Sequence, residues 1–504
     1  MKNLILINHR EYESRIAIIE NDQPVELHIE RKSDKRLVGN IYKGEVIRVL
    51  PGMQAAFVDI GLERAAFLYV SDIVADRLLQ RMEEKWCEDE GFEGTEECEE
   101  HIISKKVSIE KLIKEKDKIL VQIVKDPIST KGARLTTHIT LPGRFVVFMP
   151  TIDHIGVSHK ISNQKERDRL KKILEQHRPL NTGFIARTNA EDEREENIVA
   201  DMELLTQLWN NILKRYEKSP ARECIYQEFS LPLKIVRDYC NETVNNIIVD
   251  DKALYDEIKE FVQLYIPFMS RRVRYYDERE PLFEAFGLEN TISRLLARKV
   301  WLRSGGYIVI DQAEALTVID VNTGKYVGKR NLEETITRTN LEAAQEIAYQ
   351  IRLRNIGGII IIDFIDMNKP SNREKVIRKL EAELKKDRVK TTTSRISELG
   401  LVEMTRKRTT DSITRLISEP CHYCDGKGFI KSKNTIVYEI AREVEQKAHI
   451  TSGEIIRVKA HPVVVDSLYQ ENKPFIEDIE KRYKKAIVIE PMAEFHLEQY
   501  EVED

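Results

Sequence analysis

Two aspartates end apolar runs that have the composition of strands. Asp320 closes "LTVID" and Asp363 closes "IIIID". Four consecutive β-branched residues before Asp363 predict a strand covered on both faces. A carboxylate at the edge of a dry core is costly unless something positive meets it. We therefore expect a basic side chain or a metal ion beside these acids.

The chain between the two acids predicts a strand–helix–strand unit. Apolar residues recur at helical spacing over roughly 332–354, and Gly357 and Gly358 stop that helix. If the two strands are parallel neighbours, a spacing of ~5 Å brings both carboxylates within reach of one cation. Oxygen ligands suit Mg²⁺ or Mn²⁺, which can activate water. Asn322 points to the same side as Asp320 and could orient the ligands.

A simpler interpretation of these acids stays open. Asp320 and Asp363 could be strand-end turn residues or helix caps. Asp311 also ends an apolar strand, and we expect only a structural role for it. Asp366 could be a further ligand, but a local turn residue is the preferred interpretation.

The segment "CHYCDGKG" has the spacing of a zinc half-site, with Cys421 and Cys424 on a tight turn. A tetrahedral zinc needs four ligands, and the chain has no second pair of this kind. Two chains that share one zinc, each giving Cys421 and Cys424, would complete the site. The alternative is a redox dithiol, but we see no thioredoxin-like strand–CxxC–helix context around it.

Residues 38–75 predict a small β-barrel, because short alternating runs are broken by glycines, and 118–126 offers a closing strand. Phe57 and Phe67 fall at facing ends of two of these strands. Such barrels bind single-stranded nucleic acid by stacking bases on aromatic rings. The alternative for both rings is a place in the core. Lys131 could add a phosphate contact, although a solvated lysine is the default.

Composition limits the class of protein. The chain has 504 residues, so several domains are expected. Its 80 Lys and Arg against 85 Asp and Glu give a net charge of −5, which does not indicate a general polyanion binder. No apolar run approaches a membrane span and no signal peptide is evident, so we expect a cytoplasmic protein without membrane contact. The acidic stretch 83–100 predicts a solvated insertion without an assigned function.

Taken in their order along the chain, the motifs resemble those of the ribonuclease E/G family over essentially the whole chain. The strings that carry the resemblance are "NIYKG", "AAFVDIG", "KGARLTT", "IARTNAE", "SGGYIVIDQAEALTVIDVNTG", "NLEETI", "TNLEAAQEIAYQIRLRNIGGIIIIDFIDM", "DRVK", "GLVEMTRKR" and "CHYCDGKG".

The resemblance implies an α/β multidomain fold with six parts. They are an RNase H-like subdomain (1–37 plus 232–295), an S1-type OB barrel that binds RNA (38–127), a 5′-sensor (128–231), a DNase I-like catalytic subdomain (296–417), a zinc link (418–432) and a small C-terminal dimerisation domain (433–504).

It also implies roles for residues that match the family's motifs. Asp320 and Asp363 match the acids that bind catalytic Mg²⁺, and Asn322 matches a supporting position. Phe57, Phe67 and Lys131 match residues that hold RNA, and Cys421 and Cys424 match the cysteines that bind structural Zn²⁺. The 5′-phosphate pocket corresponds to Gly143, Val147, Arg187, Thr188 and Lys390. Lys390 replaces an arginine found in some members, which gives up bidentate phosphate geometry.

The expected function is single-strand-specific, Mg²⁺-dependent cleavage of RNA with a preference for 5′-monophosphate ends, in rRNA 5′-end processing and mRNA decay. The expected assembly is a homodimer, with a homotetramer as a further option. Two alternatives remain at this stage: a non-catalytic RNA-binding protein, and a metal-dependent phosphodiesterase that acts on DNA or small nucleotides.

Overall fold

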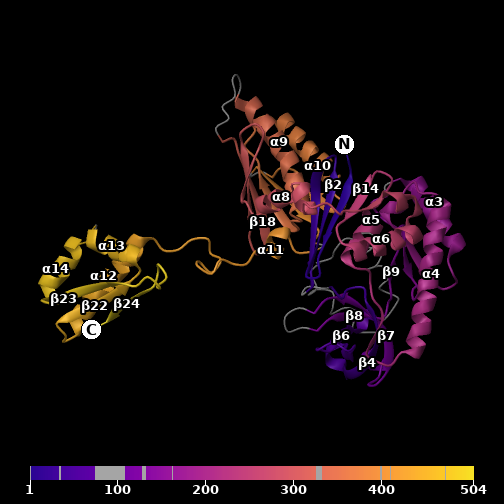
Figure 1. The fold of residues 1–504 in the computed structure, drawn as a ribbon, viewed down its shortest axis with the longest axis horizontal. Coiled ribbons are helices and arrows are strands. Elements are labelled where there is room, and N and C mark those ends of the chain that lie inside the picture. Colours follow the sequence, from indigo (N-terminus) through magenta and orange to yellow (C-terminus); the bar gives the residue numbers. More distant parts are fainter. Residues whose placement is uncertain are drawn as a thin grey trace. The chain divides into compact units, whose positions relative to one another are not determined.

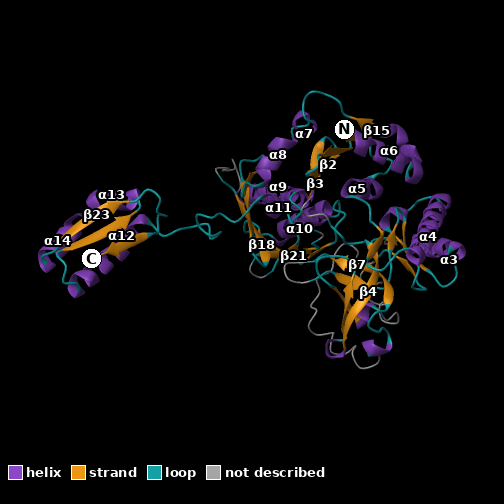
Figure 2. Ribbon diagram, turned by 60° about the horizontal axis from the view of Figure 1, so that its bottom comes forward, coloured by secondary structure: helices purple, strands orange, loops and turns teal. Residues whose placement is uncertain are grey.

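A computed structural model describes residues 2–32, 36–73, 108–127, 132–161, 163–324, 332–397, 400–408, 410–470 and 473–503. Lys131 and the acidic stretch 83–100 lie outside these residues. The chain forms two compact units, Met1–Leu416 and Ile417–Asp504. Figures 1 and 2 show the mixed helices and strands of both units, which confirms the expected α/β multidomain class. No helix in the described ranges is long and apolar enough to cross a membrane.

The first sheet joins segments that are far apart in the sequence. Its strand order is β15-β14-β1-β2-β3, and β1 is parallel to β14. The strands are β1 (Leu4–His9), β2 (Glu13–Glu20), β3 (Gln23–Arg31), β14 (Asn246–Val249) and β15 (Val273–Tyr275). Helices α5 (Leu231–Tyr239) and α6 (Lys252–Tyr265) supply much of its core, and α7 (Leu282–Ala285) and α8 (Leu288–Leu295) follow.

A five-stranded barrel follows, as the alternating runs predicted. The order β4-β5-β6-β8-β7 closes through pairing of β4 with β7, and β13 extends the sheet beside β4. The strands are β4 (Ile41–Leu50), β5 (Ala55–Asp59), β6 (Ala66–Tyr69), β7 (Lys118–Lys125), β8 (Arg134–Thr136) and β13 (Glu223–Tyr226). Short 3₁₀ turns at Pro51–Met53, Val70–Asp72 and Ile109–Lys111 complete its connections.

Residues 141–218 form a small sheet with two long helices. Its order is β11-β12-β10-β9. The elements are β9 (Leu141–Pro142), β10 (Val146–Met149), β11 (Ile155–Val157), α3 (Gln164–His177), β12 (Gly183–Ala186) and α4 (Glu195–Lys218). Apolar residues of α3 and α4 share one core with β10 and β12.

The sheet of greatest interest has the order β16-β17-β18-β19-β21-β20. The strands are β16 (Lys299–Trp301), β17 (Tyr307–Gln312), β18 (Leu316–Asn322), β19 (Gly358–Asp363), β20 (Thr391–Thr393) and β21 (Leu401–Arg406). Helices α9 (Leu332–Leu353) and α10 (Pro370–Leu384) pack on one face, and α11 (Ile413–Ile417) follows β21. Figure 1 shows α9 and α10 side by side above β18. The predicted strand–helix–strand unit is confirmed, because β18 and β19 are parallel and α9 connects them.

The expectation that the isoleucine strand is covered on both faces is wrong. Burial alternates along β19, where Ile360 and Ile362 are buried while Ile359 is 50% exposed. Among the described residues, helices α9 and α10 both pack on the face that carries Ile360 and Ile362, and the opposite face carries the exposed Ile359. A run of β-branched residues therefore indicated the strand correctly but not the number of covered faces. We call the uncovered side the open face.

The second unit, Ile417–Asp504, is a three-stranded sheet with helices. Its strand order is β23-β22-β24. The elements are α12 (Lys433–Ile450), β22 (Ile455–Ala460), α13 (Pro462–Gln470), α14 (Lys473–Tyr483), β23 (Ala486–Pro491) and β24 (Tyr500–Glu503). Ser432 caps α12 by accepting a hydrogen bond from the Thr435 amide at 3.2 Å. A core of its own holds this unit together.

Candidate active site

The paired acids lie directly opposite each other on neighbouring strands. Asp320 of β18 is in register with Asp363 of β19, and both side chains are exposed on the open face. The strand spacing of ~5 Å places their carboxylates next to each other. Asn322 follows on the same face, and its Nδ2 donates a hydrogen bond of 2.6 Å to Oδ2 of Asp320. The structure thus brings together the three residues that the sequence selected.

The electrostatics of this pair suit a cation. Partial burial, together with the negative charges of Asp320 and Asp366, raises the pKa of the Asp363 carboxyl. No basic side chain among the described residues forms an ion pair with Asp320 or Asp363. Two adjacent carboxylates without a basic partner in the described part of the chain form an arrangement that suits a divalent cation.

The donor set leaves room for water. Within the described ranges, no group of three or more His, Cys, Asp or Glu side chains is arranged to hold a metal. Two carboxylates with an adjacent amide would leave most positions of a hard cation to water or substrate oxygens, which is the usual habit of Mg²⁺. Asp311, on the neighbouring strand, instead pairs through both oxygens with Arg298. The structural role expected for Asp311 agrees with that contact.

The barrel carries its aromatic pair on the outside. Phe57 of β5 is directly opposite Phe67 of β6, and their ring centroids are 4.4 Å apart with an interplanar angle of 51°. Both rings are partly exposed, whereas the adjacent Leu68 is buried in the barrel core. The core interpretation of these phenylalanines is therefore wrong, because the period of two along the strands turns both outward.

Sequence reasoning missed how far this aromatic surface extends. Tyr69 lies two residues after Phe67 on the same face, with its ring 6.5 Å from that of Phe67 and nearly parallel to it. The Arg134 guanidinium lies 5.2 Å from the centroid of Tyr69. The period of two in "FLY" was the available signal. Lys43 does not join this surface, since its Nζ donates to the carbonyls of Tyr216 and Ser219.

The residues proposed for a 5′-phosphate pocket form a second polar site. Arg187 donates from Nη1 to the carbonyl of Gly143 and, at 2.8 Å, to Oδ1 of Asp238. The neighbouring Thr188 hydroxyl lies 3.3 Å from that of Ser158. Val147 is buried on β10 opposite Ile185 of β12. These contacts bring the loops after β9 and β12 together.

Gly143 has a steric reason to be glycine. A Cβ at this position would lie 2.5 Å from Oδ2 of Asp201. That same oxygen accepts backbone hydrogen bonds from Phe145 at 2.8 Å and Val146 at 3.1 Å. A larger residue would displace the carboxylate that holds this turn.

Asp238 is the part of this site that sequence analysis did not find. Burial opposes its ionisation, but Arg187 and Arg237 outweigh that cost and hold the pKa of the Asp238 carboxyl well below its ordinary value. Arg388 also donates to the Asp238 carbonyl at 2.6 Å. Lys390 lies two residues after Arg388, so this segment approaches the Arg187 site through Arg388. Nothing in the local sequence singled out Asp238, because its partners are distant along the chain.

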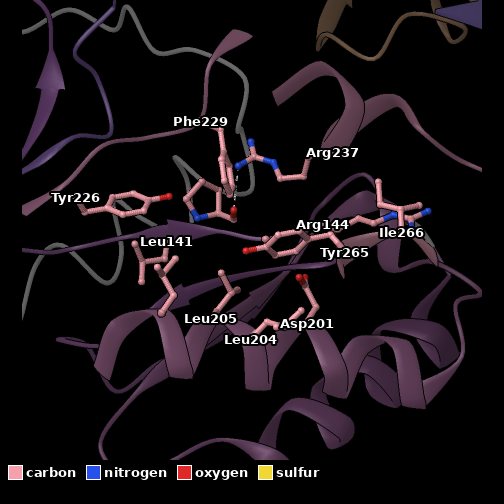
Figure 3. A pocket seen from close by; sticks show the side chains of 13 residues that line it. Leu141, Arg144, Asp201, Leu204, Leu205, Tyr226, Phe229, Arg237, Tyr265 and Ile266 are labelled. Atoms are coloured by element: carbon pink, nitrogen blue, oxygen red, sulfur yellow. Dashed lines mark hydrogen bonds between the residues drawn. The ribbon is translucent and has the colours of Figure 1, made fainter. Parts of the chain in front are cut away.

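A small cavity beside this site is too small for a nucleotide. It has a volume of about 20 Å³, and Asp201, Tyr226, Arg237 and Tyr265 are among its polar lining residues. Figure 3 shows these side chains converging, with Arg237 bonded to the Pro142 carbonyl at 3.0 Å. A volume of this size accommodates about one water molecule. The cavity therefore has a structural rather than a substrate-binding scale.

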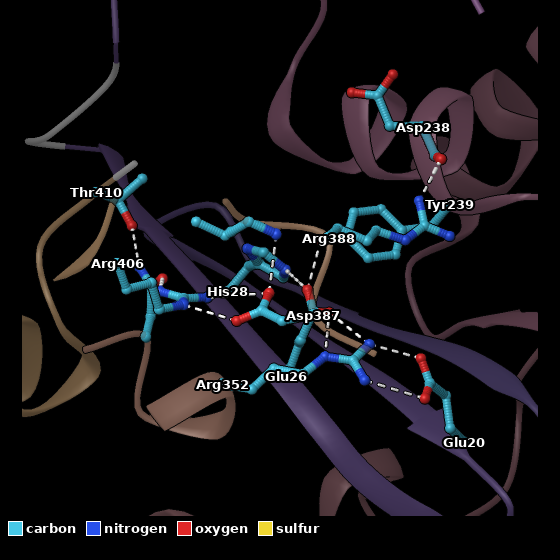
Figure 4. Close-up of polar contacts among 12 residues, drawn as sticks. Glu20, Glu26, His28, Asp238, Tyr239, Arg352, Asp387, Arg388, Arg406 and Thr410 are labelled. Carbon is cyan, nitrogen blue, oxygen red and sulfur yellow. Dashed lines mark hydrogen bonds and ion pairs between the residues drawn. The ribbon is translucent and has the colours of Figure 1, made fainter. Parts of the chain in front are cut away.

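Buried ion pairs fix α9 and β21 relative to their neighbours. Arg352 near the end of α9 donates to Glu26 of β3 at 2.7 Å and to Glu20 of β2 at 2.6 Å. Arg406 of β21 donates to Asp387 at 2.7 Å. Figure 4 shows both arginines in this polar layer. Since α9 packs against β18 and β19, these contacts help to position the strands that carry the acids.

Cys421 and Cys424 lie in a run of turns in the second unit. The Cys424 and Gly426 amides donate to the Cys421 carbonyl at 3.3 and 3.1 Å, and the Gly428 amide donates to Sγ of Cys424 at 3.3 Å. Backbone N–H groups of Tyr423 and Cys424 lower the pKa of the Cys421 thiol. The turn presents both thiols, and no third ligand joins them within the described part of the chain. This geometry fits a zinc half-site.

Comparison with known proteins identifies the class. A model of the ribonuclease E/G family matches residues 140–409, and a model described as "RNase E/G, Thioredoxin-like domain" matches residues 420–504. The chain belongs to the ribonuclease E/G family.

Particular relatives align over most of the chain. Ribonuclease G of Escherichia coli K12 is 43% identical over 498 residues, which cover 99% of each protein. Ribonuclease G of Haemophilus influenzae is 44% identical over 499 residues, or 99% of this chain and 98% of that protein. Ribonuclease E of Haemophilus influenzae is 32% identical over 493 residues, which cover 97% of this chain and 51% of that protein.

The thioredoxin-like description of residues 420–504 was not expected from sequence. The residues next to the cysteine pair lack the strand–CxxC–helix pattern that would indicate such a domain. In the structure, helix α11 and the irregular residues 418–420 precede Cys421, and α12 starts only at Lys433. The cysteine pair therefore does not occupy a strand-to-helix junction, although the domain that contains it matches a thioredoxin-like model.

Proposed function

We propose that this protein cleaves single-stranded RNA in a Mg²⁺-dependent reaction and prefers substrates with a 5′-monophosphate. Membership of the ribonuclease E/G family makes it an endoribonuclease, a hydrolase of RNA. The observation that carries the metal-dependent step is the register of Asp320 with Asp363 on the open face, without a basic partner among the described residues.

Asp320 and Asp363 would hold the cation. Bound there, Mg²⁺ would supply Lewis acidity and a more acidic water for attack on a phosphodiester. Asn322 orients the Asp320 carboxylate through its 2.6 Å hydrogen bond. The products expected from the family resemblance carry 5′-phosphate and 3′-hydroxyl ends.

The barrel would hold the single-stranded RNA. Phe57 and Phe67 offer outward rings for base stacking, and Tyr69 with Arg134 extends that surface. Lys131 keeps its proposed phosphate contact from the resemblance and lies outside the described residues.

Arg187 would recognise the 5′-monophosphate. Its guanidinium donates to an anionic oxygen of Asp238 at 2.8 Å, and a phosphate oxygen would accept the same kind of charge-assisted hydrogen bond. Gly143, Val147, Thr188 and Lys390 complete the proposed pocket.

The remaining proposals concern organisation and cellular role. We assign residues 1–37 plus 232–295 as RNase H-like, 38–127 as the S1-type domain, 128–231 as the 5′-sensor, 296–417 as DNase I-like, 418–432 as the zinc link and 433–504 as the dimerisation domain. From the family resemblance alone, we also propose a cytoplasmic homodimer or homotetramer that acts in rRNA 5′-end processing and mRNA decay.

The central test compares Asp363→Asn with Asp311→Asn. Each enzyme is incubated with a 5′-monophosphorylated RNA and Mg²⁺, and cleavage products are resolved on a gel. Asp363→Asn should abolish cleavage, whereas Asp311→Asn, which alters an acid on the neighbouring strand, should retain it. Cleavage that survives Asp363→Asn would remove Asp363 from the mechanism. DNA of the same sequence should resist the wild-type enzyme.

The 5′-phosphate proposal has its own arm in this assay. Arg187→Ala should lower kcat/KM on 5′-monophosphorylated RNA about tenfold or more, since a charge-assisted hydrogen bond is worth ~1.5–3 kcal/mol. The same variant should cleave 5′-hydroxyl RNA almost as well as the wild type does. An equal loss on both substrates would contradict a sensing role for Arg187.

A further inference from the structure

Two aromatic rings and a lysine form a cluster at one edge of the open face. Trp301 of β16 pairs with Tyr307 of β17, and their ring centroids are 5.4 Å apart at an interplanar angle of 64°. Nζ of Lys299 lies 4.1 Å from the centroid of Trp301 and 3.5 Å from that of Tyr307. We call Lys299, Trp301 and Tyr307 the edge cluster.

The strand register places the edge cluster on the same surface as the catalytic acids. Tyr307 is opposite Asn322, and Val309, which pairs with Lys299, is opposite Asp320. Residues opposite each other on antiparallel strands share one face of a sheet. Trp301 is therefore two strands, or ~10 Å, from Asn322 along one row of the open face.

The edge cluster leaves a large aromatic ring exposed to solvent. Trp301 is 64% exposed although Lys299 lies against its ring. Lys299 is also exposed and forms no ion pair with the described residues. An exposed ring beside an ammonium group that has no carboxylate partner among the described residues is a combination that binds single-stranded nucleic acid, because the ring can stack on a base and the charge can meet a phosphate.

We propose that the edge cluster is a second base-stacking subsite, in which Trp301 receives a nucleobase of the RNA strand held at Asp320 and Asp363 and Lys299 meets an adjoining phosphate. This inference rests on the proposed function, because the strand is its substrate. The subsite takes any base, since each base has a flat face for stacking. This subsite would direct the RNA strand away from the two acids, across β17 toward β16.

A purely structural role would predict different behaviour. Cross-strand aromatic pairs stabilise sheets, and a lysine on an edge strand such as β16 discourages pairing with other chains. In that case, removal of Trp301 would change the stability of the protein. Its effect on cleavage would then not depend on which base of the substrate is missing.

The experiment uses a series of 5′-monophosphorylated oligoribonucleotides with one cleavage site, each with one abasic ribose at a different position. For the wild-type enzyme, one abasic position should raise KM about tenfold, within the range that base–aromatic stacking of ~1–3 kcal/mol gives. Trp301→Ala should raise KM for intact RNA to the same extent and add no loss at that abasic position. Trp301→Phe should restore the discrimination.

Two controls make the result specific. Tyr12→Ala removes an aromatic side chain that is 70% exposed in the turn between β1 and β2, and it should leave every KM unchanged. Lys299→Met should reduce the salt slope of log affinity by ~0.7, the value for one phosphate contact on a single strand. Binding is measured by fluorescence anisotropy in the Asp363→Asn background, so that it does not depend on cleavage.

The outcomes separate this inference from the proposed function. If wild-type enzyme cleaves intact RNA but Trp301→Ala has no effect, or lowers activity equally at every abasic position, the subsite is refuted and the proposed function stands. If wild-type enzyme fails to cleave any RNA, the proposed function fails. The anisotropy series then decides the subsite alone, and coupling of Trp301 to one abasic position would support it.

Discussion

At the scale of single residues, the negative charge of Asp320 opposes the ionisation of Asp363 on the open face. Asp363 has a raised pKa in the folded protein because of partial burial and the charges of Asp320 and Asp366. A carboxyl with a raised pKa binds more protons when folded than when unfolded. Its effect therefore lowers the free energy of unfolding as pH rises from the unfolded pKa through the folded one. At neutral pH, without metal, the full cost of the ionised pair is present.

This argument predicts that Asp320→Asn stabilises the metal-free protein at neutral pH. The gain in the free energy of unfolding should be roughly 0.2–1 kcal/mol, the range for one directly opposed pair on a sheet. It should vanish at a pH low enough to protonate both acids. Urea unfolding in a chelator measures the gain, and Mg²⁺ should stabilise the wild type but not the variant.

Asp311→Asn is the matched control, because it removes an acid that pairs with Arg298 rather than one that faces another acid. It should not raise the free energy of unfolding. A loss of stability in Asp320→Asn at neutral pH in a chelator would refute the repulsion between the two carboxylates.

The sequence indicated the two acids but not every residue of the polar and aromatic sites. Asp320, Asp363 and Asn322 were accessible because they end or follow strands whose order a crossover helix fixes. Asp238 and the pairing of Trp301 with Tyr307 were not accessible, because each depends on a register or a distant contact that no local pattern contains.

At the scale of elements, the barrel shows how one strand serves two purposes. Phe67 and Leu68 are neighbours on β6, yet Phe67 faces outward and Leu68 is fully buried. Alternation along the strand separates a surface for binding from a surface for packing.

Substitution of these two neighbours should therefore have opposite effects. Phe67→Ala should weaken binding of single-stranded RNA by ~1–3 kcal/mol, since it removes a stacking ring, and should change stability little. Leu68→Ala should lower the free energy of unfolding by ~2–5 kcal/mol through loss of core packing. RNA titrations and urea unfolding of both variants give the comparison. A large loss of stability in Phe67→Ala would mean that the Phe67 ring is part of the core.

The elements themselves were predicted unevenly. The barrel, α9 and the parallel pair β18–β19 followed from alternation, helical period and glycine stops. The open face did not follow, because "IIII" fits a strand covered on either one or two faces. Which applies depends on the helices available to cover it, and here α9 and α10 lie on the same side.

At the scale of the whole molecule, the second unit would provide only half of the ligands of the proposed zinc site. Cys421 and Cys424 provide two thiolates on one turn, and no further ligand joins them among the described residues. Structural zinc is four-coordinate and closed. Two copies of the chain would supply four thiolates, so the proposed zinc link requires a dimer.

Stoichiometry provides the last prediction. Purified protein should contain one zinc for every two chains, and Cys421→Ser should lose the zinc and shift the mass in solution toward the monomer. Metal analysis and light scattering measure both. Cys224→Ser, which changes a half-buried cysteine of β13, is the control and should keep metal and mass unchanged. One zinc per chain, or an unchanged mass in Cys421→Ser, would mean that the ion is not shared. Because thiolate ligands must be deprotonated, the dimer should also weaken as pH falls.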